Sequence, residues 1–211
     1  MSAPGDETRQ RLLDAAIREF AESGVHNASL LEITRVAGQR NRGAVHYHFG
    51  SREGMLVAVL QTEAPFLAER ELQLLARAEE RPDDDLESVI TAIVQPVVEL
   101  AEKDWRGRCY LRIVAEVIQE DPASVDPEVQ RTLDSTGGVQ VYGLLERRLP
   151  PLPDDIRIER ISLMTMFILH SVAERARLAE RETGRGQLGT DRFVANLVAM
   201  AAAMMLAPVP A

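Results

Sequence analysis

Between Glu32 and Glu53 the chain carries cationic and small polar side chains of the kinds that hold an anion. This stretch contains no Asp or Glu but four arginines, Arg35, Arg40, Arg42 and Arg52. The chain as a whole has a net charge of -9. Guanidinium groups bind phosphate oxygens and also pair with O6 and N7 of guanine. A carboxylate-free stretch in an acidic protein therefore indicates a surface for the phosphates and base edges of DNA.

Two short predicted helices position these side chains. Ser29 and Glu32 have the spacing of a capping box, in which the serine accepts from a free amide and the glutamate reaches back. The helix that follows, Glu32 to Val36, is expected to end at Ala37-Gly38, where glycine can adopt the left-handed conformation. A second helix is expected from Arg42 to His48. This pattern is typical of a helix-turn-helix, whose second helix enters the major groove.

The predicted DNA contacts are ten residues: Ser29, Arg40, Asn41, Arg42, Gly43, Ala44, His46, Tyr47, His48 and Arg52. Arg40 and Arg42 flank the turn and suit phosphate or guanine. Asn41 is expected either to cap the second helix or to bond a base. The alternative interpretation makes the arginines an ordinary solvated face.

The other candidates supply close approach and further polar contacts. Gly43 and Ala44 lack bulk, so the helix can approach the groove closely, and the Ala44 methyl group could meet a thymine methyl. Tyr47 and His48 suit phosphates or base edges. Arg52 begins the next helix, whose N-terminal amides add to a phosphate site.

These residues resemble the TetR/AcrR family of bacterial transcriptional regulators. The resemblance rests on Phe20 to Gly24, on Ile33-x-x-Val36-Ala37-Gly38, on Gly43 to Phe49 and on Ser51-Arg52-Glu53, and it covers about residues 6 to 60. Two departures are His46, where the family usually has tyrosine, and a turn at 39–41 that is one residue longer. The resemblance implies that the aromatic pair contacts the DNA backbone and that the protein is a dimer.

Composition limits the other possibilities. Cys109 is the single cysteine of the 211 residues, so a disulfide framework and a thiolate metal site are excluded, and no cofactor is expected. His46 and His48 are two apart, which is poor metal-ligand spacing on a helix. The first ten residues contain no apolar signal core, which predicts a cytoplasmic protein. No nucleophile elbow, phosphate loop or metal cluster is present, so an enzyme is not expected.

The apolar periodicity predicts an all-α fold of about nine helices. We expect a three-helix helix-turn-helix domain at residues 1–50 and a helical ligand-binding and dimerisation domain at 51–211. Residues 1–60 are neutral overall and the remainder carries the negative charge. A first helix, Thr8 to Ser23, should bury an apolar stripe. A long helix from Ser51 to about Ala78 should be kinked at Pro65, and another, about 84–103, contains Pro96.

The last two predicted helices, about 155–182 and 190–206, contain long uncharged segments. A helix that is apolar most of the way round is buried on more than one side. We therefore expect a homodimer through these two helices, with burial inside a monomer as the alternative. The run from Phe193 stops before Pro208, about 15 residues or roughly 22 Å, which is too short for a membrane span.

A ligand site in the helical body is the second functional expectation. Its candidate residues are Phe66, Trp105, Cys109, Tyr110, Tyr142, Met164, Phe167 and His170. They would line an apolar pocket with one or two polar anchors for a small apolar effector. The competing interpretation makes them plain core, with His170 a satisfied core histidine and Cys109 buried filler.

Together these features predict a repressor that leaves a palindromic operator when an apolar small molecule binds. A transcriptional activator, or a DNA-binding regulator that senses no ligand, is the alternative. A helical module that only binds other proteins is a third possibility, which sequence-specific DNA binding would exclude.

Overall fold

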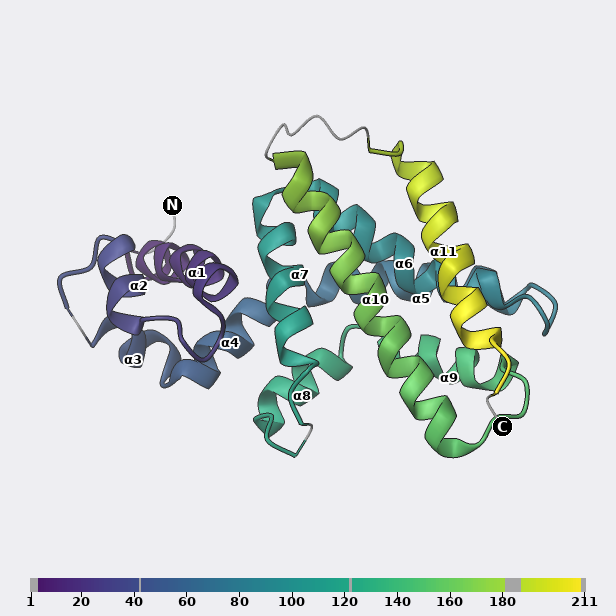
Figure 1. The fold of residues 1–211 in the computed structure, drawn as a ribbon. Helices are drawn as coiled ribbons and strands as arrows, with labels where there is room; N and C mark the ends of the chain where they lie inside the picture. Colours follow the sequence, from purple (N-terminus) through teal and green to yellow (C-terminus); the bar gives the residue numbers. More distant parts are fainter. Residues whose placement is uncertain (1–3, 42, 122, 181–186, 210–211) are drawn as a thin grey trace. The chain divides into compact units, whose positions relative to one another are not determined.

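The computed structural model describes residues 4–41, 43–121, 123–180 and 187–209, and the regular structure in these ranges is entirely α-helical (Figure 1). The all-α prediction is confirmed. Eleven helices occur in the described ranges: α1 Pro4–Ser23, α2 Leu30–Val36, α3 Ala44–Phe49, α4 Arg52–Leu60, α5 Ala64–Glu79, α6 Leu86–Lys103, α7 Trp105–Val117, α8 Pro127–Asp134, α9 Gly138–Arg148, α10 Asp154–Glu180 and α11 Thr190–Leu206.

The count exceeds nine because two stretches expected to be single helices are each divided. One is the stretch from Ser51 to about Ala78, and the other runs from Pro127 to about Arg148, where the pair Gly137-Gly138 predicts a bend or a split. The chain leaves the helix after Leu60 and starts α5 at Ala64, so Pro65 lies in a first turn, where its missing N–H costs nothing. Instead of the expected kink at Pro65, the helix is interrupted just before this residue. Pro96 lies inside α6, which continues past the proline. The second division falls at Gly137, whose φ of +96° separates α8 from α9.

The chain forms two compact units. The first comprises the residues up to Pro65 together with Asp104–Leu133, and the second comprises Phe66–Lys103 together with the residues from Asp134 onward. The first unit therefore contains α1 to α4, α7 and nearly all of α8. The helix-turn-helix predicted within residues 1–50 is one part of this unit.

The first unit is built around α1, which packs against α2, α4 and α7. The predicted apolar stripe of α1 is confirmed, since its members are all buried: Leu12, Leu13, Ala16, Ile17 and Phe20. The apolar residues of α2 differ in burial: Ile33 is fully buried, whereas Val36, for which the sequence also predicts a core position, is 54% exposed. It is the last residue of α2, and the turn that follows leaves its side chain facing solvent.

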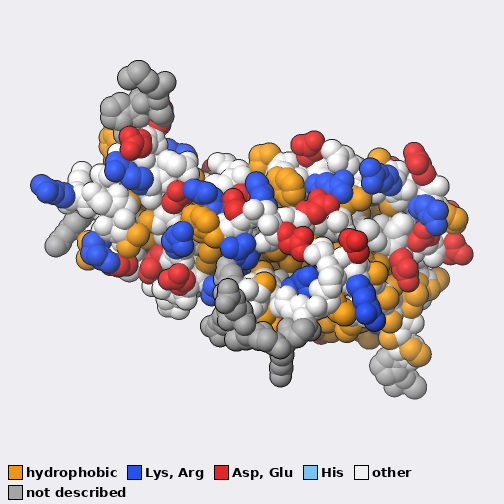
Figure 2. Space-filling model, turned by 90° about the horizontal axis from the view of Figure 1, so that it is seen from above, with side chains coloured by type: hydrophobic (Ala, Val, Ile, Leu, Met, Phe, Trp, Pro, Cys, Tyr) orange, Lys and Arg blue, Asp and Glu red, His pale blue; other side chains and the backbone are white. Residues whose placement is uncertain are grey.

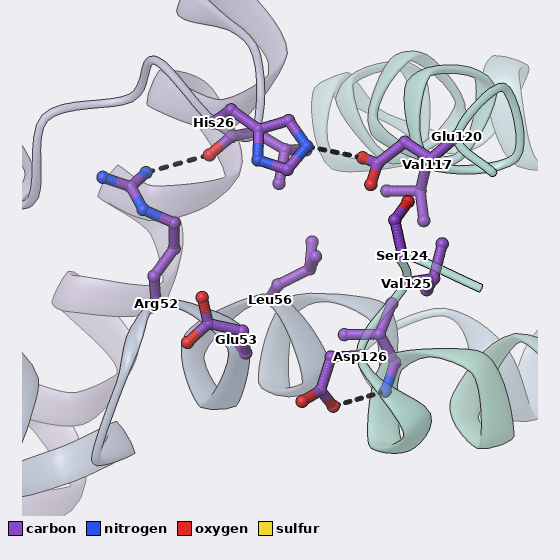
Figure 3. Close-up of a pocket in the computed structure, with 11 residues that line it drawn as sticks. His26, Arg52, Glu53, Leu56, Val117, Glu120, Ser124, Val125 and Asp126 are labelled. Atoms are coloured by element: carbon purple, nitrogen blue, oxygen red, sulfur yellow. Dashed lines mark hydrogen bonds and ion pairs between the residues drawn. The ribbon is translucent and has the colours of Figure 1, made fainter. Parts of the chain in front are cut away.

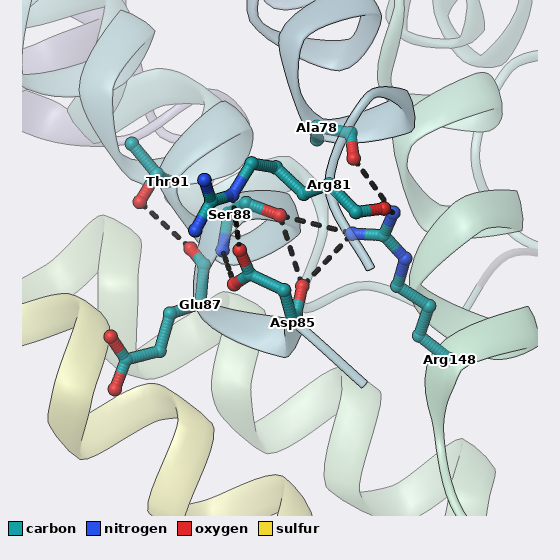
Figure 4. A network of polar contacts seen from close by, with 7 residues as sticks. All are labelled: Ala78, Arg81, Asp85, Glu87, Ser88, Thr91 and Arg148. Atoms are coloured by element: carbon teal, nitrogen blue, oxygen red, sulfur yellow. Dashed lines mark hydrogen bonds and ion pairs between the residues drawn. The ribbon is translucent and has the colours of Figure 1, made fainter. Parts of the chain in front are cut away.

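The second unit is built around α6, which packs against α9, α10 and α11. Arg148, at the end of α9, joins the connection between α5 and α6 (Figure 4). Its guanidinium donates to the carbonyl oxygens of Ala78 at 2.7 Å, Arg81 at 3.0 Å and Asp85 at 2.9 Å. A positive group on these carbonyls satisfies acceptors that α5 leaves open at its C-terminal end. None of the helices described is long and apolar enough to cross a bilayer.

Candidate nucleic-acid interface

The first helix of the motif, α2, is capped by two different side chains. Ser29 accepts from the amide of Glu32 at 3.2 Å, as the capping box requires. Glu32 does not complete the box, because it forms a two-pronged ion pair with Arg35. Glu19 of α1 accepts from the Ser29 amide at 3.1 Å instead. The start of α2 is therefore tied to α1 through a contact that local sequence does not reveal.

The ion pair between Glu32 and Arg35 on α2 makes Arg35 a weaker candidate for DNA contact. Hydrogen bonding from Arg35 lowers the pKa of Glu32, so the carboxylate stays ionised at neutral pH. Both side chains are solvent-exposed or nearly so, and an exposed pair of this kind contributes little stability. Arg35 nevertheless has a local anion, so its charge is less available to DNA than that of the exposed Arg40.

The turn after α2 is a Schellman motif. Gly38 has a φ of +70°, and its amide donates to the Arg35 carbonyl at 3.0 Å. The amide of Gln39 donates to the Thr34 carbonyl, also at 3.0 Å. These two bonds satisfy the carbonyls at the end of the helix and reverse the chain, as the left-handed glycine was predicted to do.

The second helix of the motif, α3, begins two residues later than expected. Asn41 accepts from the Gly43 amide at 2.9 Å through its side chain, which forms an Asx turn just before α3. The N-cap of α3 is Gly43, which has no side-chain cap, so the base contact expected for Asn41 stays a prediction. Arg42, a predicted contact, lies outside the described residues.

The exposed face of α3 presents aromatic and imidazole groups. Tyr47 is 84% exposed, which is exceptional for a large apolar ring, and its ring meets that of His48 edge-on at 4.9 Å. His46 is also exposed and His48 is half-buried. An exposed tyrosine hydroxyl and exposed imidazole groups can form hydrogen bonds with phosphates and base edges, so these side chains stay candidate DNA contacts.

One predicted contact on α3 does not fit the structure. Ala44 is only 6% exposed, because its methyl group packs inside the domain together with Val45. The methyl group therefore has little exposed surface for the predicted contact with thymine. Gly43, just before it, is exposed and leaves the entry to α3 free of bulk.

The next helix, α4, closes the motif. Ser51 caps it by accepting from the Gly54 amide at 3.0 Å. Arg52 donates to the Val25 carbonyl at 2.9 Å, so part of its guanidinium ties α4 to the loop between α1 and α2. Its remaining N–H groups stay candidates for a phosphate. A Cβ at Gly54 would lie 2.1 Å from the Phe49 carbonyl oxygen, so α3 and α4 meet at a position that only glycine can fill.

Helix α7 packs against α1 and α4. Asp104 caps α7 by accepting from the amides of Arg106 and Gly107. Arg106 forms two bonds to the Asp14 carboxylate, at 2.8 and 3.0 Å. Further along α7, Glu116 accepts from the Val25 amide at 2.9 Å. The positions in these pairs are about 90 residues apart in the chain, so the pattern of neither segment could predict them.

The Asp14–Arg106 pair gives a measurable coupling between α1 and α7. Each side chain is about one-third exposed, so solvent screening reduces the interaction. We expect a double-mutant cycle with Asp14→Asn and Arg106→Gln to give a coupling of about 1 kcal/mol in urea unfolding. The coupling should decrease between 0.05 and 0.5 M salt. A zero coupling at low salt would show that this contact does not hold the two helices together.

A cavity of about 370 Å³ lies within the first unit, beside these contacts (Figure 3). Its polar wall includes His26, whose Nε2 lies 2.7 Å from Glu120, and the Arg52 side chain described above. The full lining is Val25, His26, Arg52, Glu53, Leu56, Val117, Glu120, Ser124, Val125, Asp126 and Val129. It contains none of the eight residues predicted to line a ligand pocket.

Those eight residues fall into both units. Trp105, Cys109 and Tyr110 belong to α7 in the first unit. The Trp105 ring is covered by the guanidinium of Arg18, 3.7 Å from its centroid, and by that of Arg106, at 4.8 Å. Tyr110 is fully buried and Cys109 is half-buried. The interpretation as core or inter-helix packing thus fits Trp105 and Tyr110 better than an open ligand wall.

The remaining five lie in the second unit: Phe66, Tyr142, Met164, Phe167 and His170. His170 is exposed, and its Nδ1 lies 3.0 Å from the Met166 carbonyl of its own helix. The expectation that His170 is an internal polar anchor, or a core histidine, is wrong for the single chain. Met164 is fully buried, and Tyr142 bonds the Thr165 hydroxyl at 2.7 Å. In the described residues no His, Cys, Asp and Glu side chains group as metal ligands.

Comparisons with known proteins agree with this architecture. The model for "Bacterial regulatory proteins, tetR family" matches residues 12–59, and that for "Tetracyclin repressor-like, C-terminal domain" matches 91–204. The HTH-type transcriptional regulator AcrR of Shigella flexneri is 34% identical over 177 residues, which are 80% of this chain and 77% of AcrR. The regulator SrpR of Pseudomonas putida is 48% identical over 59 residues, 28% of this chain and 27% of SrpR.

Solved structures share the fold at low sequence identity. A TetR family regulator from Marinobacter aquaeolei VT8 has a TM-score of 0.60 and 17% identity, covering 94% of this chain and 95% of its own. AibR, solved with isovaleryl coenzyme A and operator DNA, has a TM-score of 0.53 and 14% identity, covering 92% and 97%. The exposed helix-turn-helix and these matches define a DNA-binding transcriptional regulator and not an enzyme. The chain belongs to the TetR family.

Proposed function

We propose that the protein is a homodimeric repressor that binds a palindromic operator and leaves it when a small molecule binds. The observation that carries the DNA-binding part is the surface of α3, where Tyr47 and His46 are exposed next to Arg40 and the Asx turn at Asn41. In a dimer, two such helices would enter major grooves about 34–36 Å apart. Binding to the chromosome would make the bacterial cytoplasm its place of action.

The dimer is supported by an apolar face on α10 and α11. Figure 2 shows hydrophobic side chains gathered along the lower right of the view, on the side where α10 and α11 lie in front in Figure 1. Large apolar side chains of these helices are exposed in the single chain: Ile158, Leu163, Met200 and Leu206. Burying such a face against a second copy removes apolar area from water.

The repressor role and the effector are supported by relatives. Several relatives matching over about 30% of this chain are repressors named AcnR from Corynebacterium species, 34–36% identical. AibR was solved with both an acyl-coenzyme A and operator DNA, so a protein of this fold can hold both kinds of ligand. An effector that binds the released state more tightly by about 1–3 kcal/mol would lower operator affinity about five- to 150-fold.

An activator is the second candidate, because CecR of Shigella flexneri, 39% identical over 70 residues, is a dual regulator. A reporter fused to the operator separates the two roles. Deleting the gene raises expression if the protein represses, and lowers it if the protein activates.

DNA contact by α3 and the turn is tested by two substitutions. We expect Tyr47→Ala to weaken operator binding about tenfold or more, the value of one well-placed contact, while thermal stability stays unchanged because the ring is exposed. Arg40→Ala should reduce the slope of log affinity against log salt by about one, because one phosphate contact is lost.

Arg77→Ala, an exposed arginine on α5, is the matched control and should leave the slope unchanged. Band shifts at 50 to 200 mM salt provide both measurements. Wild-type affinity in Tyr47→Ala and an unchanged slope in Arg40→Ala would remove these residues from the interface.

A further inference from the structure

Two of the chain's four histidines lie on the six-residue helix α3. His46 is exposed and His48 is half-buried. Consecutive residues of an α-helix are about 100° apart around its axis, so the two imidazoles lie on either side of Tyr47, which is 84% exposed. A helix that enters the major groove with Tyr47 foremost therefore directs one imidazole toward each wall of the groove, where the phosphates lie.

The imidazoles of α3 have no hydrogen-bond or ion-pair partner within the part of the chain that the structure describes. The His48 ring contacts aromatic rings, that of Tyr47 edge-on at 4.9 Å between centroids and that of Phe49 at 6.3 Å. The other two histidines are engaged, since His26 lies 2.7 Å from a carboxylate oxygen and His170 lies 3.0 Å from a backbone carbonyl. Those of α3 can therefore take a partner from outside the protein.

Helices α2 and α4 pack against α3, and each carries one carboxylate that is already engaged. On α2, Glu32 pairs with Arg35. On α4, hydrogen bonds from the Glu53 backbone amide and from Ser51 hold the pKa of the Glu53 carboxyl below its usual range. The other charged groups described beside α3 are guanidinium groups: Arg9 over the Phe49 ring, Arg40 in the turn and Arg52 at the start of α4. An anion for a protonated imidazole must therefore come from outside the chain, and a DNA phosphate is such an anion.

We propose that the imidazoles of His46 and His48 take up protons when the operator binds, so that the protein binds DNA more tightly as the pH falls. This proposal rests on the proposed function, and it adds a regulating signal, the proton, to the same DNA-binding surface. A neutral imidazole has one N–H donor, whereas an imidazolium has two donors and a positive charge. A phosphate oxygen beside the ring therefore favours the charged form.

The sign of the effect follows from the linkage between proton binding and DNA binding. The charge of histidine ordinarily changes between pH 5 and 8. Within this range bound phosphates draw protons onto the rings, and added protons strengthen DNA binding in return. Above it the rings are neutral with or without DNA, so the affinity no longer depends on pH. A phosphate contact that favours the imidazolium form about tenfold raises the affinity about fivefold for each ring between pH 8 and pH 6, and about 25-fold for both.

Fluorescence anisotropy at pH 6 and pH 8 tests the proposal with the full-length protein. The probe is a labelled duplex of about 40 base pairs that the wild-type protein enriches from a random library at pH 7, long enough for two half-sites one turn apart. The ionic strength is held constant, because salt alone changes DNA affinity. We expect the wild-type protein to bind this duplex more tightly at pH 6 by about 25-fold, the product of two fivefold effects.

Substitutions of the two histidines assign the protons. Glutamine keeps a hydrogen-bonding side chain but cannot take up a proton, so His46→Gln and His48→Gln should each reduce the affinity ratio to about fivefold. The double variant should bind with the same affinity at both pH values. His46→Lys should bind more tightly than wild type at pH 8, because lysine is charged throughout this range.

The matched control is His26→Gln, because His26 is an exposed histidine of the same unit that titrates in any pH series (Figure 3). It lies in the loop between α1 and α2, where its Nε2 is 2.7 Å from Glu120. His26→Gln should keep the wild-type affinity ratio between pH 6 and pH 8. Thermal melts of every variant at both pH values check that the protein is folded.

Equal affinity of the wild-type protein at pH 6 and pH 8 overturns the proposal, and so does a pH dependence that persists in the double variant. A pH dependence that disappears in His26→Gln alone assigns the proton to the loop between α1 and α2, and also overturns it. All three outcomes leave sequence-specific DNA binding intact. Failure of the wild-type protein to enrich any duplex would instead contradict the proposed function.

Discussion

Replacing Gly54 with alanine is expected to destabilise the protein by about 3 kcal/mol and to abolish operator binding at 37 °C. The added methyl carbon would lie 2.1 Å from the carbonyl oxygen of Phe49. That oxygen belongs to the backbone, so it can move away only if the end of α3 shifts relative to α4. Overpacking of this kind costs about 1–3 kcal/mol or more, and here it falls on α3, the helix proposed to contact DNA.

The control for Gly54 is a glycine in an ordinary helical position. Gly143 lies inside α9, and a Cβ there would meet nothing closer than 3.7 Å. Gly143→Ala should therefore stabilise the protein by about 0.5–1 kcal/mol through helix propensity. Urea unfolding measures both variants. Equal stability of Gly54→Ala and wild type would mean that α3 and α4 do not approach as closely as described.

The second large effect concerns the apolar face of α10 and α11. Leu163 is 51% exposed and Met200 47% exposed in the single chain. We expect Leu163→Glu combined with Met200→Glu to give a folded monomer, because these side chains contribute little to the core of their own subunit. Charges placed in an apolar interface cost several kcal/mol when they are desolvated without partners.

Operator affinity of this monomer should fall at least 100-fold. In a dimer, binding of one half-site holds the second recognition helix near the other, and this effective concentration is lost when the subunits separate. Sedimentation velocity and band shifts on a two-half-site operator give the two readings. Leu72→Glu, an equally exposed position on α5, should remain dimeric. A double variant that still sediments as a dimer would place the interface elsewhere.

Local features of the DNA-binding motif could be predicted from sequence because their contacts span a few residues. The Ser29 cap and the left-handed Gly38 depend only on short-range backbone geometry. The spacing predicts that Glu32 completes the capping box, but the Glu32 carboxylate instead accepts hydrogen bonds from Arg35, three residues further along the helix. Glu19 accepts from the Ser29 amide because α1 packs against α2. The residues of the motif alone do not predict this packing.

The features that sequence could not predict depend on contacts between distant segments. In the sequence Gly54 looks like any glycine in a helix, and only its closeness to the Phe49 carbonyl at the end of α3 shows why a larger residue does not fit. Glu71 of α5 is 8% exposed, and the start of α9 lies close to it, since a Cβ at Gly137 would lie 3.3 Å from the Glu71 Cβ. For His170 the sequence predicts a position in the pocket or the core, but the side chain is exposed in the single chain.

The attachment of α7 to the DNA-binding helices affects how hybrid regulators should be constructed. Joining the first 50 residues of this protein to another regulator's body would remove the partners of Asp14 and Val25, namely Arg106 and Glu116. A transplant that keeps its operator specificity must carry a discontinuous cassette, the residues up to Pro65 with Asp104–Leu133. Synthetic-biology designs that cut this fold at a single junction are therefore expected to yield regulators with weakened operator binding.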